Sequence, residues 1–272
     1  MRSFILLIFT TIIFSTEAYG AWTSLAPGME LGTFAVNKSS PNSDARITIL
    51  RIDPKIWELV LIGKSWGNKS ENQTARDWCQ NYKLTAAINA GMFSADYTTH
   101  VGYLGSNRHV NSSQVNKYMS VAAFNPRKGT GLPEFRIFDL DAPNVKMETI
   151  LGGFSSVVQN LRLIKRPSEN RWSQQDKMWS EAALGEDSSG RALFIFSRSP
   201  FTMHEFNRKL LSLEIGLVAA QHLEGGPEAQ LYLGIGNVTH EMFGSYETSF
   251  RENDGNTAPW PIPNVLGVRP RP

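Results

Sequence analysis

Short segments with strand-like hydrophobicity dominate the chain and restrict the folds that it can adopt. Arg46–Asp53 alternates polar and apolar residues, which is the two-residue period of a half-buried strand. Leu84–Asn89 and Leu217–Leu223 are almost continuously apolar, as expected for strands that are covered on both faces. The same reasoning predicts further strands at Ser120–Phe124, Glu134–Leu140, Leu161–Ile164 and Gln230–Gly236. A chain built mainly of such segments buries them in β-sheet.

Turn residues between neighbouring segments predict two strand pairs. Arg46–Asp53 and Trp57–Ile62 are separated by an Asp-Pro turn and are expected to form a β-hairpin. Glu181–Gly185 and Ala192–Ser197 flank a polar turn that contains Gly, and we expect them to pair as well. Such local connections indicate antiparallel rather than parallel sheets.

Only two segments have convincing helix signals. Thr74 begins a T-x-x-D capping box ahead of Ala75–Tyr82, and Thr202 begins a T-x-x-E box for a helix over Thr202–Leu213. The Pro-rich segment Ala258–Val268 is expected to wrap around an edge of the fold. Together these features predict an α+β fold, mainly antiparallel β-sheet with a few helices, in a single compact domain.

The first twenty residues have the layout of a secretory signal peptide. Arg2 precedes the apolar stretch Phe4–Phe14, and the small residues Ala18 and Gly20 follow at a plausible cleavage site. We therefore expect a signal peptide over residues 1–20, a mature domain over residues 21–272, and a periplasmic or secreted protein without stable membrane insertion after cleavage. An uncleaved N-terminal anchor is the alternative.

Composition excludes several classes of protein. With 27 Lys and Arg against 25 Asp and Glu, the net charge of +2 lacks the basic excess of a nucleic-acid-binding protein. The single Cys79 rules out a disulfide framework, and we expect it to be buried and inert. No nucleotide-binding or metalloprotease motif is present, and the five His residues lack metal-ligand spacing, so neither a cofactor nor a metal is expected.

The segment AAINAGMF is the first candidate for function. It places Asn89 at the end of a buried strand, where its amide can both donate to and accept from sugar hydroxyls. Gly91 lets the chain turn or lets a ligand approach the backbone. The irregular, Gly-, Tyr- and His-containing stretch Gly91–Ser113 follows, and such long stretches are usually either functional or disordered. Alternatively, Asn89 caps a turn by bonding to its own backbone.

The segment HLEGGPEA is the second candidate. Glu224 and Glu228 flank a rigid Gly-Gly-Pro turn, and glycoside cleavage uses paired carboxylates as proton donor and as base or nucleophile. The amides of Gly225 and Gly226 can form an anion-binding nest, and His222 immediately precedes them. A surface turn with two solvated carboxylates is the alternative.

The third candidate combines an acidic and a basic residue, Glu181 and Arg198, at the ends of two predicted strands. Arg198 stands at the end of an apolar strand just before the helix that Thr202 opens, a suitable place for a phosphate or carboxylate clamp. Glu181 begins a strand where a polar residue facing a cleft is expected. An ordinary salt bridge is the alternative for Arg198.

Taken in order, these segments resemble the phosphodiester glycosidase family, in a variant typical of a distinct bacterial branch. The resemblance departs from the common family pattern at the candidate site. Glu181 stands where the family has Arg, Glu224 where it has Asp, and Glu228 where it has Ser. An exchange of Arg for Glu reverses the charge of a phosphate site. The matching segments are TARDW (74–78), AAINAGMF (86–93), GYLG (102–105), LGG (151–153), EAALGEDSSGR (181–191), LEGGPEA (223–229) and PIPNVLGV (261–268).

The resemblance implies an exported hydrolase that cleaves a sugar-1-phosphodiester or a related envelope glycoconjugate. Glu224, Glu228 and Glu181 would then be catalytic. The substrate would be bound by Asn89, Gly91, Arg198, His222, Gly225 and Gly226. Two alternatives remain open at this point: a non-catalytic glycan-binding envelope protein of the same fold, and a hydrolase of neutral glycosides.

Overall fold

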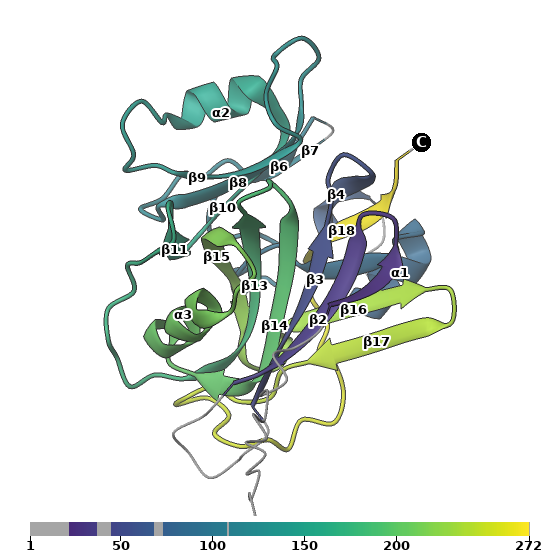
Figure 1. The fold of residues 1–272 in the computed structure, drawn as a ribbon, viewed down its shortest axis with the longest axis vertical. Helices are drawn as coiled ribbons and strands as arrows, with labels where there is room; N and C mark the ends of the chain where they lie inside the picture. The colour runs from purple at the N-terminus through teal and green to yellow at the C-terminus, as the bar shows by residue number, and fades with distance from the viewer. Residues whose placement is uncertain (1–21, 37–44, 68–72, 108, 272) are drawn as a thin grey trace, which may run out of the picture.

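The computed structural model describes residues 22–36, 45–67, 73–107 and 109–271. The predicted signal peptide lies outside these residues. The described chain folds into three antiparallel sheets with three α-helices on their outer faces (Figure 1). This confirms the predicted α+β class and the single compact domain. None of the described helices is long and apolar enough to cross a membrane.

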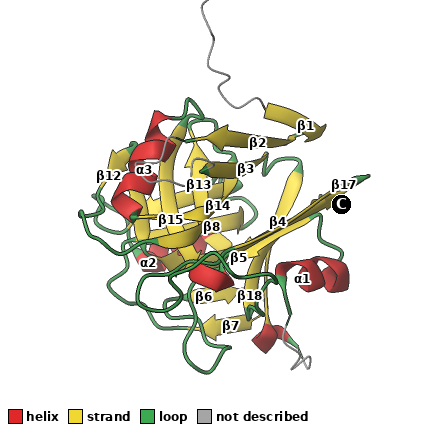
Figure 2. Ribbon diagram, turned by 90° about the horizontal axis from the view of Figure 1, so that it is seen from below, coloured by secondary structure: helices red, strands yellow, loops and turns green. Residues whose placement is uncertain are grey.

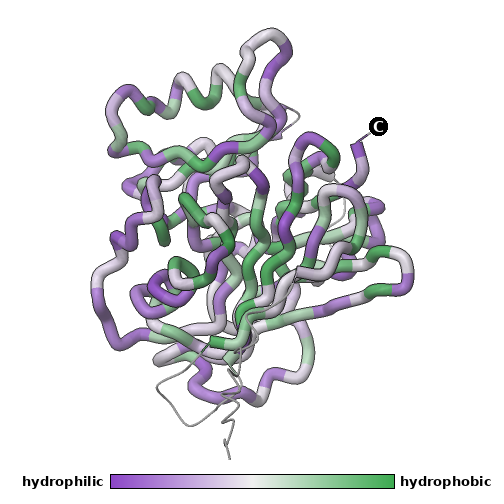
Figure 3. The backbone as a smooth tube through the Cα atoms, in the orientation of Figure 1, coloured by the Kyte–Doolittle hydropathy of each residue, from purple (hydrophilic) through white to green (hydrophobic). Residues whose placement is uncertain are grey.

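The largest sheet has eight strands, and every neighbouring pair in it is antiparallel. Its central strands carry long apolar runs because both of their faces are covered (Figure 3). In spatial order it contains β1 (Trp22–Ala26), β2 (Met29–Ala35), β3 (Arg46–Ile52), β14 (Ala192–Phe201), β13 (Trp179–Asp187), β15 (Leu217–Gly225), β11 (Arg162–Lys165) and β12 (Glu169–Asn170).

Two five-stranded sheets complete the fold. One contains β7 (His109–Ser112), β6 (Leu104–Ser106), β10 (Phe154–Asn160), β8 (Ser120–Pro126) and β9 (Phe135–Asp139), in that spatial order. The other contains β17 (Val238–Phe243), β16 (Gln230–Ile235), β5 (Ala86–Asn89), β18 (Asn264–Pro270) and β4 (Trp57–Gly63). Two short 3₁₀ helices, η1 (Lys64–Trp66) and η2 (Gly226–Glu228), follow β4 and β15.

Each sheet is covered by one α-helix, as Figure 2 shows from below. The predicted helices are α1 (Ala75–Tyr82), with both hydrogen bonds of its capping box, and α3 (Met203–Ser212), which Thr202 caps. The sequence analysis missed the short α2 (Met147–Gly153), because it lacks a side-chain cap and ends in two glycines.

The inner faces of the three sheets share one hydrophobic core. Its buried residues include Phe194 of the eight-stranded sheet, Ile88 and Leu266 of one small sheet, and Phe124 of the other. Because all three inner faces pack against one another, the ends of strands from different sheets come close together at the surface of this core. Cys79 lies outside it, on the buried face of α1, as the expectation of a buried thiol required, and burial raises the pKa of this thiol.

Two sequence-based expectations about pairing are wrong. β3 and β4 do not form a hairpin, because β3 pairs with β2 and β14 while β4 pairs with β18 in another sheet. The C-terminal segment does not wrap an edge either. Pro259, Pro261 and Pro263 come before β18 begins, and β18 then runs between β4 and β5 inside the sheet. The expected pairing of β13 with β14 is confirmed.

Candidate active site

The three sheets meet where β5, β10 and β15 end, and most of the predicted site residues lie at this junction. The backbone N–H of His222 in β15 donates to the carbonyl of Leu161, just beyond β10, at 2.9 Å. The side-chain amide of Asn160 donates to the carbonyl of Ala90, just beyond β5, at 3.0 Å. Strands that are far apart in the sequence therefore place their ends side by side.

Glu181 and His222 form a buried pair at the centre of this junction. Nδ1 of His222 lies 2.8 and 2.9 Å from the two carboxylate oxygens of Glu181, and Nε1 of Trp179 donates to Oε2 at 2.6 Å. Glu181 is fully buried. Burial raises the pKa of Glu181 against the attraction of His222. Burial opposes the imidazolium charge, but the Glu181 carboxylate raises the pKa of His222. The pair holds the imidazole in one orientation.

Glu224 lies beside this pair, where β15 crosses the edge of the junction. It is half-buried, and its neighbour on β13 is Ala182, one residue from Glu181. Its carboxyl accepts one hydrogen bond, from the N–H of Gly225 at 3.1 Å. Burial raises the pKa of Glu224 to about 8, and the like charges of Glu228 and Glu247 add to the effect. Glu224 is therefore protonated at neutral pH and can donate that proton.

Two further carboxylates interact with Glu224 through their charge. Glu228 ends the short helix η2, and burial raises its pKa to about 6. Glu247, in the loop after β17, was not identified from the sequence, and burial raises its pKa as well. Each of them contributes to the raised pKa of Glu224, so the three carboxylates lie close enough to repel one another.

The predicted ligand-binding side chain of Asn89 is fully engaged by the backbone. Its amide nitrogen donates to the carbonyl of Glu228 at 2.9 Å, and its oxygen accepts from the N–H of Gln230 at 2.7 Å. Asn89 caps a turn, but a distant one, and not its own backbone as the alternative from the sequence supposed. Asn89 therefore fixes the turn that carries Glu228 against the end of β5.

Gly91 permits a close approach of two polar side chains. A Cβ at this position would lie 2.3 Å from both Asn160 Oδ1 and His100 Nε2. His100 is buried, its Nε2 lies 3.2 Å from Asn160 Oδ1, and its Nδ1 lies 3.0 Å from the N–H of Gly102. Burial lowers the pKa of His100, so the imidazole is held neutral. Gly91 thus serves the packing of the junction.

The Gly225–Gly226 turn leaves space for two neighbouring side chains. A Cβ on Gly225 would lie 2.7 Å from the indole of Trp179. Gly226 has φ +65°, which favours glycine, and a Cβ there would lie 2.6 Å from Oε2 of Glu247. Both glycines are required so that Trp179 and Glu247 can pack against the turn.

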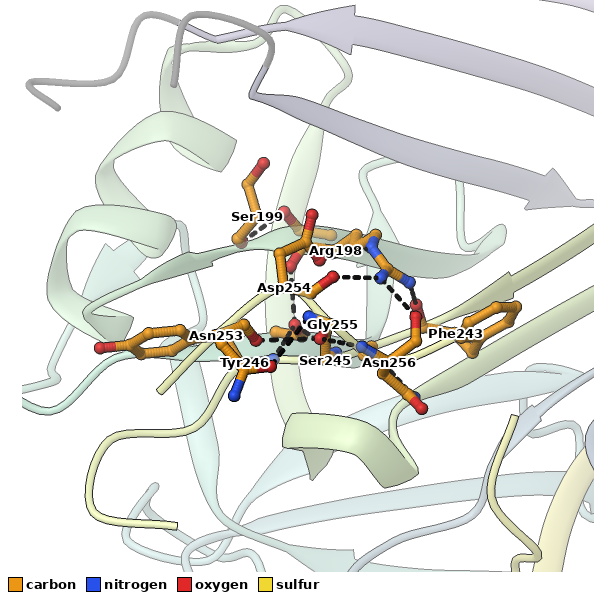
Figure 4. Close-up of polar contacts among 12 residues, drawn as sticks. Arg198, Ser199, Phe243, Ser245, Tyr246, Asn253, Asp254, Gly255 and Asn256 are labelled. Carbon is orange, nitrogen blue, oxygen red and sulfur yellow. Dashed lines mark hydrogen bonds and ion pairs between the residues drawn. The ribbon is translucent and has the colours of Figure 1, made fainter. Parts of the chain in front are cut away.

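The guanidinium of Arg198 is engaged by the protein itself (Figure 4). It forms an ion pair with Asp254 at 2.8 Å and donates to the carbonyls of Phe243, Asp254 and Asn256. This is the salt-bridge alternative raised from the sequence, extended by three carbonyl contacts. Arg198 holds the loop that follows β17 in place. Its N–H groups bond to Phe243, Asp254 and Asn256 and not to the turn that carries Glu224.

The arrangement is suited to acid–base chemistry. A protonated Glu224, the neighbouring carboxyl groups of Glu228 and Glu247, and an oriented His222 lie around one turn. Among the residues that the structure describes, no three His, Cys, Asp or Glu side chains are placed to hold a metal ion.

Sequence analysis missed several residues that hold the junction of the sheets together. His100 lies in the irregular stretch that was singled out as functional, but its partner Asn160 belongs to a distant strand. Trp179 precedes the predicted strand, and Glu247 lies in a loop without periodicity. Their roles depend on long-range contacts, which a single sequence does not encode locally.

Comparison of the sequence with known protein families identifies one family. The family model described as phosphodiester glycosidase matches residues 82–269. No curated protein sequence matches the chain significantly.

Among solved structures, the fold is similar to the zebrafish N-acetylglucosamine-1-phosphodiester alpha-N-acetylglucosaminidase catalytic domain, which is auto-inhibited by its pro-peptide. The two share 14% identity and a TM-score of 0.65, over 92% of this chain and 86% of that one. A hypothetical protein from Synechocystis gives 14% identity and a TM-score of 0.57, over 94% of this chain and 65% of that one. A putative exported protein from Burkholderia pseudomallei gives 9% identity and a TM-score of 0.51, over 85% of this chain and 75% of that one. At these identities the structures establish the fold, whereas the family model covers most of the chain. The chain belongs to the phosphodiester glycosidase family.

Proposed function

We propose that this protein is an exported hydrolase that cleaves the glycosidic bond of a sugar-1-phosphodiester or a related envelope glycoconjugate. Membership of the phosphodiester glycosidase family supports the reaction class. The observation that carries the proposal is Glu224, whose half-buried carboxyl at the junction of the sheets has a pKa raised to about 8. A carboxylic acid that stays protonated at neutral pH is the proton donor that glycoside cleavage requires.

The roles of the surrounding residues follow from their contacts. Glu224 protonates the oxygen of the leaving group, and a second carboxylate activates the attacking water. Glu181 is fully buried and bonded to His222, so it orients the imidazole rather than contacting the sugar. Asn89 and the two glycines hold the turn in place.

A hydrolase of neutral glycosides is a second candidate, favoured by one observation. Arg198, the cation expected to hold a phosphate, is bonded to Asp254 and to three carbonyls. The carboxylates around Glu224 would repel a phosphate that came near them.

A substrate panel tests the proposal and separates the candidates. Methyl diesters of sugar-1-phosphates and 4-nitrophenyl glycosides of the same sugars are incubated with the purified mature protein. Hydrolysis of the diesters supports the first function, and hydrolysis of the nitrophenyl glycosides alone supports the second. Glu224→Gln should lower kcat on the accepted substrate by roughly 100-fold or more. Unchanged turnover in that variant would reject Glu224 as the acid. Binding without hydrolysis would instead favour a glycan-binding protein.

A further inference from the structure

Glu247 is a carboxylate at the candidate site that neither the sequence motifs nor the family pattern assigned. It belongs to the segment 244–256, which follows β17 and which Arg198 fastens at its far end (Figure 4). We name this segment the 244–256 loop. Its course decides where Glu247 lies relative to Glu224.

The backbone of the 244–256 loop is bonded directly to the start of β13. The N–H of Ser180 donates to the carbonyl of Tyr246 at 2.9 Å, and the N–H of Thr248 donates to the carbonyl of Met178 at 3.0 Å. Glu247 therefore lies opposite Trp179, two residues before Glu181. A reciprocal pair of backbone bonds to Arg251, at 3.0 and 2.9 Å, closes a turn immediately after it. The backbone of Glu247 is thus held on both sides.

The side chain of Glu247, in contrast, has no bonded partner among the described residues. Its carboxylate packs on the Gly225–Gly226 turn, with Oε2 only 2.6 Å from the place that a Cβ on Gly226 would take. Its charge interacts with His222 and with Glu224. Elsewhere in the described chain, half-buried carboxylates such as Glu58 and Glu134 form ion pairs with arginines. The backbone of Glu247 is held firmly while its carboxylate stays unbonded. This is the arrangement expected of a carboxylate that acts on a bound ligand.

Glu247 is better placed than Glu228 to act opposite Glu224. Glu224 and Glu228 project from one continuous turn, whose carbonyl at Glu228 is tied to Asn89. Glu247 reaches the same turn from a separate loop. Carboxylates on separate segments can stand on two sides of a scissile bond, which is the arrangement that glycosidases use. Glu247 also interacts with His222, whose positive charge favours the ionised carboxylate.

We infer that Glu247 is the second reacting carboxylate, which accepts a proton from the attacking water while Glu224 protonates the leaving oxygen. This inference rests on the proposed hydrolase function. In the step, the water oxygen bonds to the anomeric carbon and the bond from that carbon to the leaving oxygen breaks. Glu224 loses one proton to the leaving group and Glu247 gains one from water. Exchange of both protons with solvent then restores the starting state.

The test compares Glu247→Gln with Glu224→Gln, Glu228→Gln and the matched control Glu252→Gln. Glu252 lies in the same loop, is exposed, and its carboxylate accepts a bond from the N–H of Ser249. Both kcat and KM are measured on whichever methyl sugar-1-phosphodiester or nitrophenyl glycoside the unsubstituted protein hydrolyses, and thermal unfolding is followed for every variant. Glu247→Ala is assayed with and without added formate, a small carboxylate that can occupy the vacated space.

We expect Glu247→Gln to lower kcat by 100-fold or more with little change in KM, and formate to restore part of the activity of Glu247→Ala. Glu228→Gln should retain more activity than Glu247→Gln, and Glu252→Gln should behave like the unsubstituted protein. If Glu224→Gln loses activity but Glu247→Gln stays within about threefold, this inference is overturned and the proposed function stands. A loss in Glu247→Gln that comes with a lower melting temperature and no formate rescue also overturns it. If the protein hydrolyses no member of the panel, the proposed function and this inference fall together.

Discussion

The two ends of β13 carry buried acidic side chains in opposite circumstances. At one end, Glu186 accepts from the N–H of Ile137 at 2.7 Å and forms ion pairs with Arg136 and Arg166. At the other end, the carboxylate of Glu181 is bonded, among the described residues, only to the imidazole of His222 and the indole of Trp179. Both glutamates are fully buried, and they lie on the same strand.

Their surroundings differ in the same way. Next to Glu186, Asp187 is bonded to Arg191 at 2.7 Å and lies 3.8 Å from Arg51. Next to Glu181 stand Glu224, Glu228 and Glu247, which repel one another and have no arginine partner among the described residues. Burial raises the pKa of Glu186 as well as the pKa values of these three carboxyls, so the two ends differ in their charge partners and not in burial. Carboxylates that are matched with arginines hold a fold together, whereas carboxylates gathered without them hold protons that a reaction can use. The contrast distinguishes structural from functional acids within one strand.

The largest expected effect of this contrast is on turnover. Glu181→Gln should lower kcat by roughly 100-fold or more, because His222 loses the charge that orients it. Glu186→Gln, its matched control on the same strand, should stay within about threefold. Steady-state kinetics on a hydrolysed member of the substrate panel measures both, and NMR titration should show the pKa of His222 falling in Glu181→Gln. Equal turnover in the two variants would show that Glu181 is no more important for catalysis than Glu186.

The second effect concerns stability at the arginine-matched end. Asp187 accepts from the N–H groups of Ser189 and Arg191, each at 2.9 Å, in the turn between β13 and β14. Asp187→Ala leaves these donors and the guanidinium of Arg191 without their acceptor. We expect a loss of about 2 to 3 kcal/mol in the free energy of unfolding by urea, with kcat unchanged. A loss below about 0.5 kcal/mol would show that this end is not structural.

The third effect is the pH dependence of stability at the other end. The pKa of Glu224 is raised from 4.5 to about 8 in the folded protein, so folding takes up a proton between these values. Its contribution to stability is complete below about pH 4.5 and is lost as pH rises toward about 8, by about 1.4 kcal/mol per pH unit.

Urea unfolding at several pH values checks this slope. Glu224→Gln should flatten the decline between pH 5 and pH 8, because the amide does not titrate. Glu252→Gln, on an exposed side chain, should leave the slope as it is. If Glu224→Gln left the slope unaltered, its carboxyl would not hold a proton at neutral pH and could not serve as the acid.

The parts of the fold that could be predicted from the sequence are those that local chemistry determines. Both capped helices follow from side-chain bonds within one turn, and the pairing of β13 with β14 follows from a short connection. The hairpin of β3 and β4 was wrong because a local turn does not decide which sheet each strand joins. β18 was misplaced because the prolines before it obscured its apolar run.

The candidate site shows the same division. The motifs located Glu181, His222, Glu224 and Glu228, because strand ends followed by glycine are visible in sequence. They did not show that Glu181 is bonded to His222, since the register between β13 and β15 brings these residues together. Glu247 could not be found, because its position depends on backbone bonds between a loop and β13.

The smallest expected effect tests how the 244–256 loop is held at the functional end. Arg198→Met removes the ion pair with Asp254 and the bonds to three carbonyls, whereas Asp254→Asn removes only the ion pair. Because the loop also carries Glu247, we expect Arg198→Met to lower kcat by roughly tenfold through misplacement of the Glu247 carboxylate, and Asp254→Asn to have a smaller effect.

Kinetics on a phosphodiester and on a neutral glycoside of the same sugar separates this indirect effect from direct binding of phosphate by Arg198. A raised KM for the phosphodiester alone, with kcat unchanged, would mean that Arg198 leaves its carbonyl partners to contact the substrate. Equal losses in kcat on both substrates would mean that it acts only through the loop.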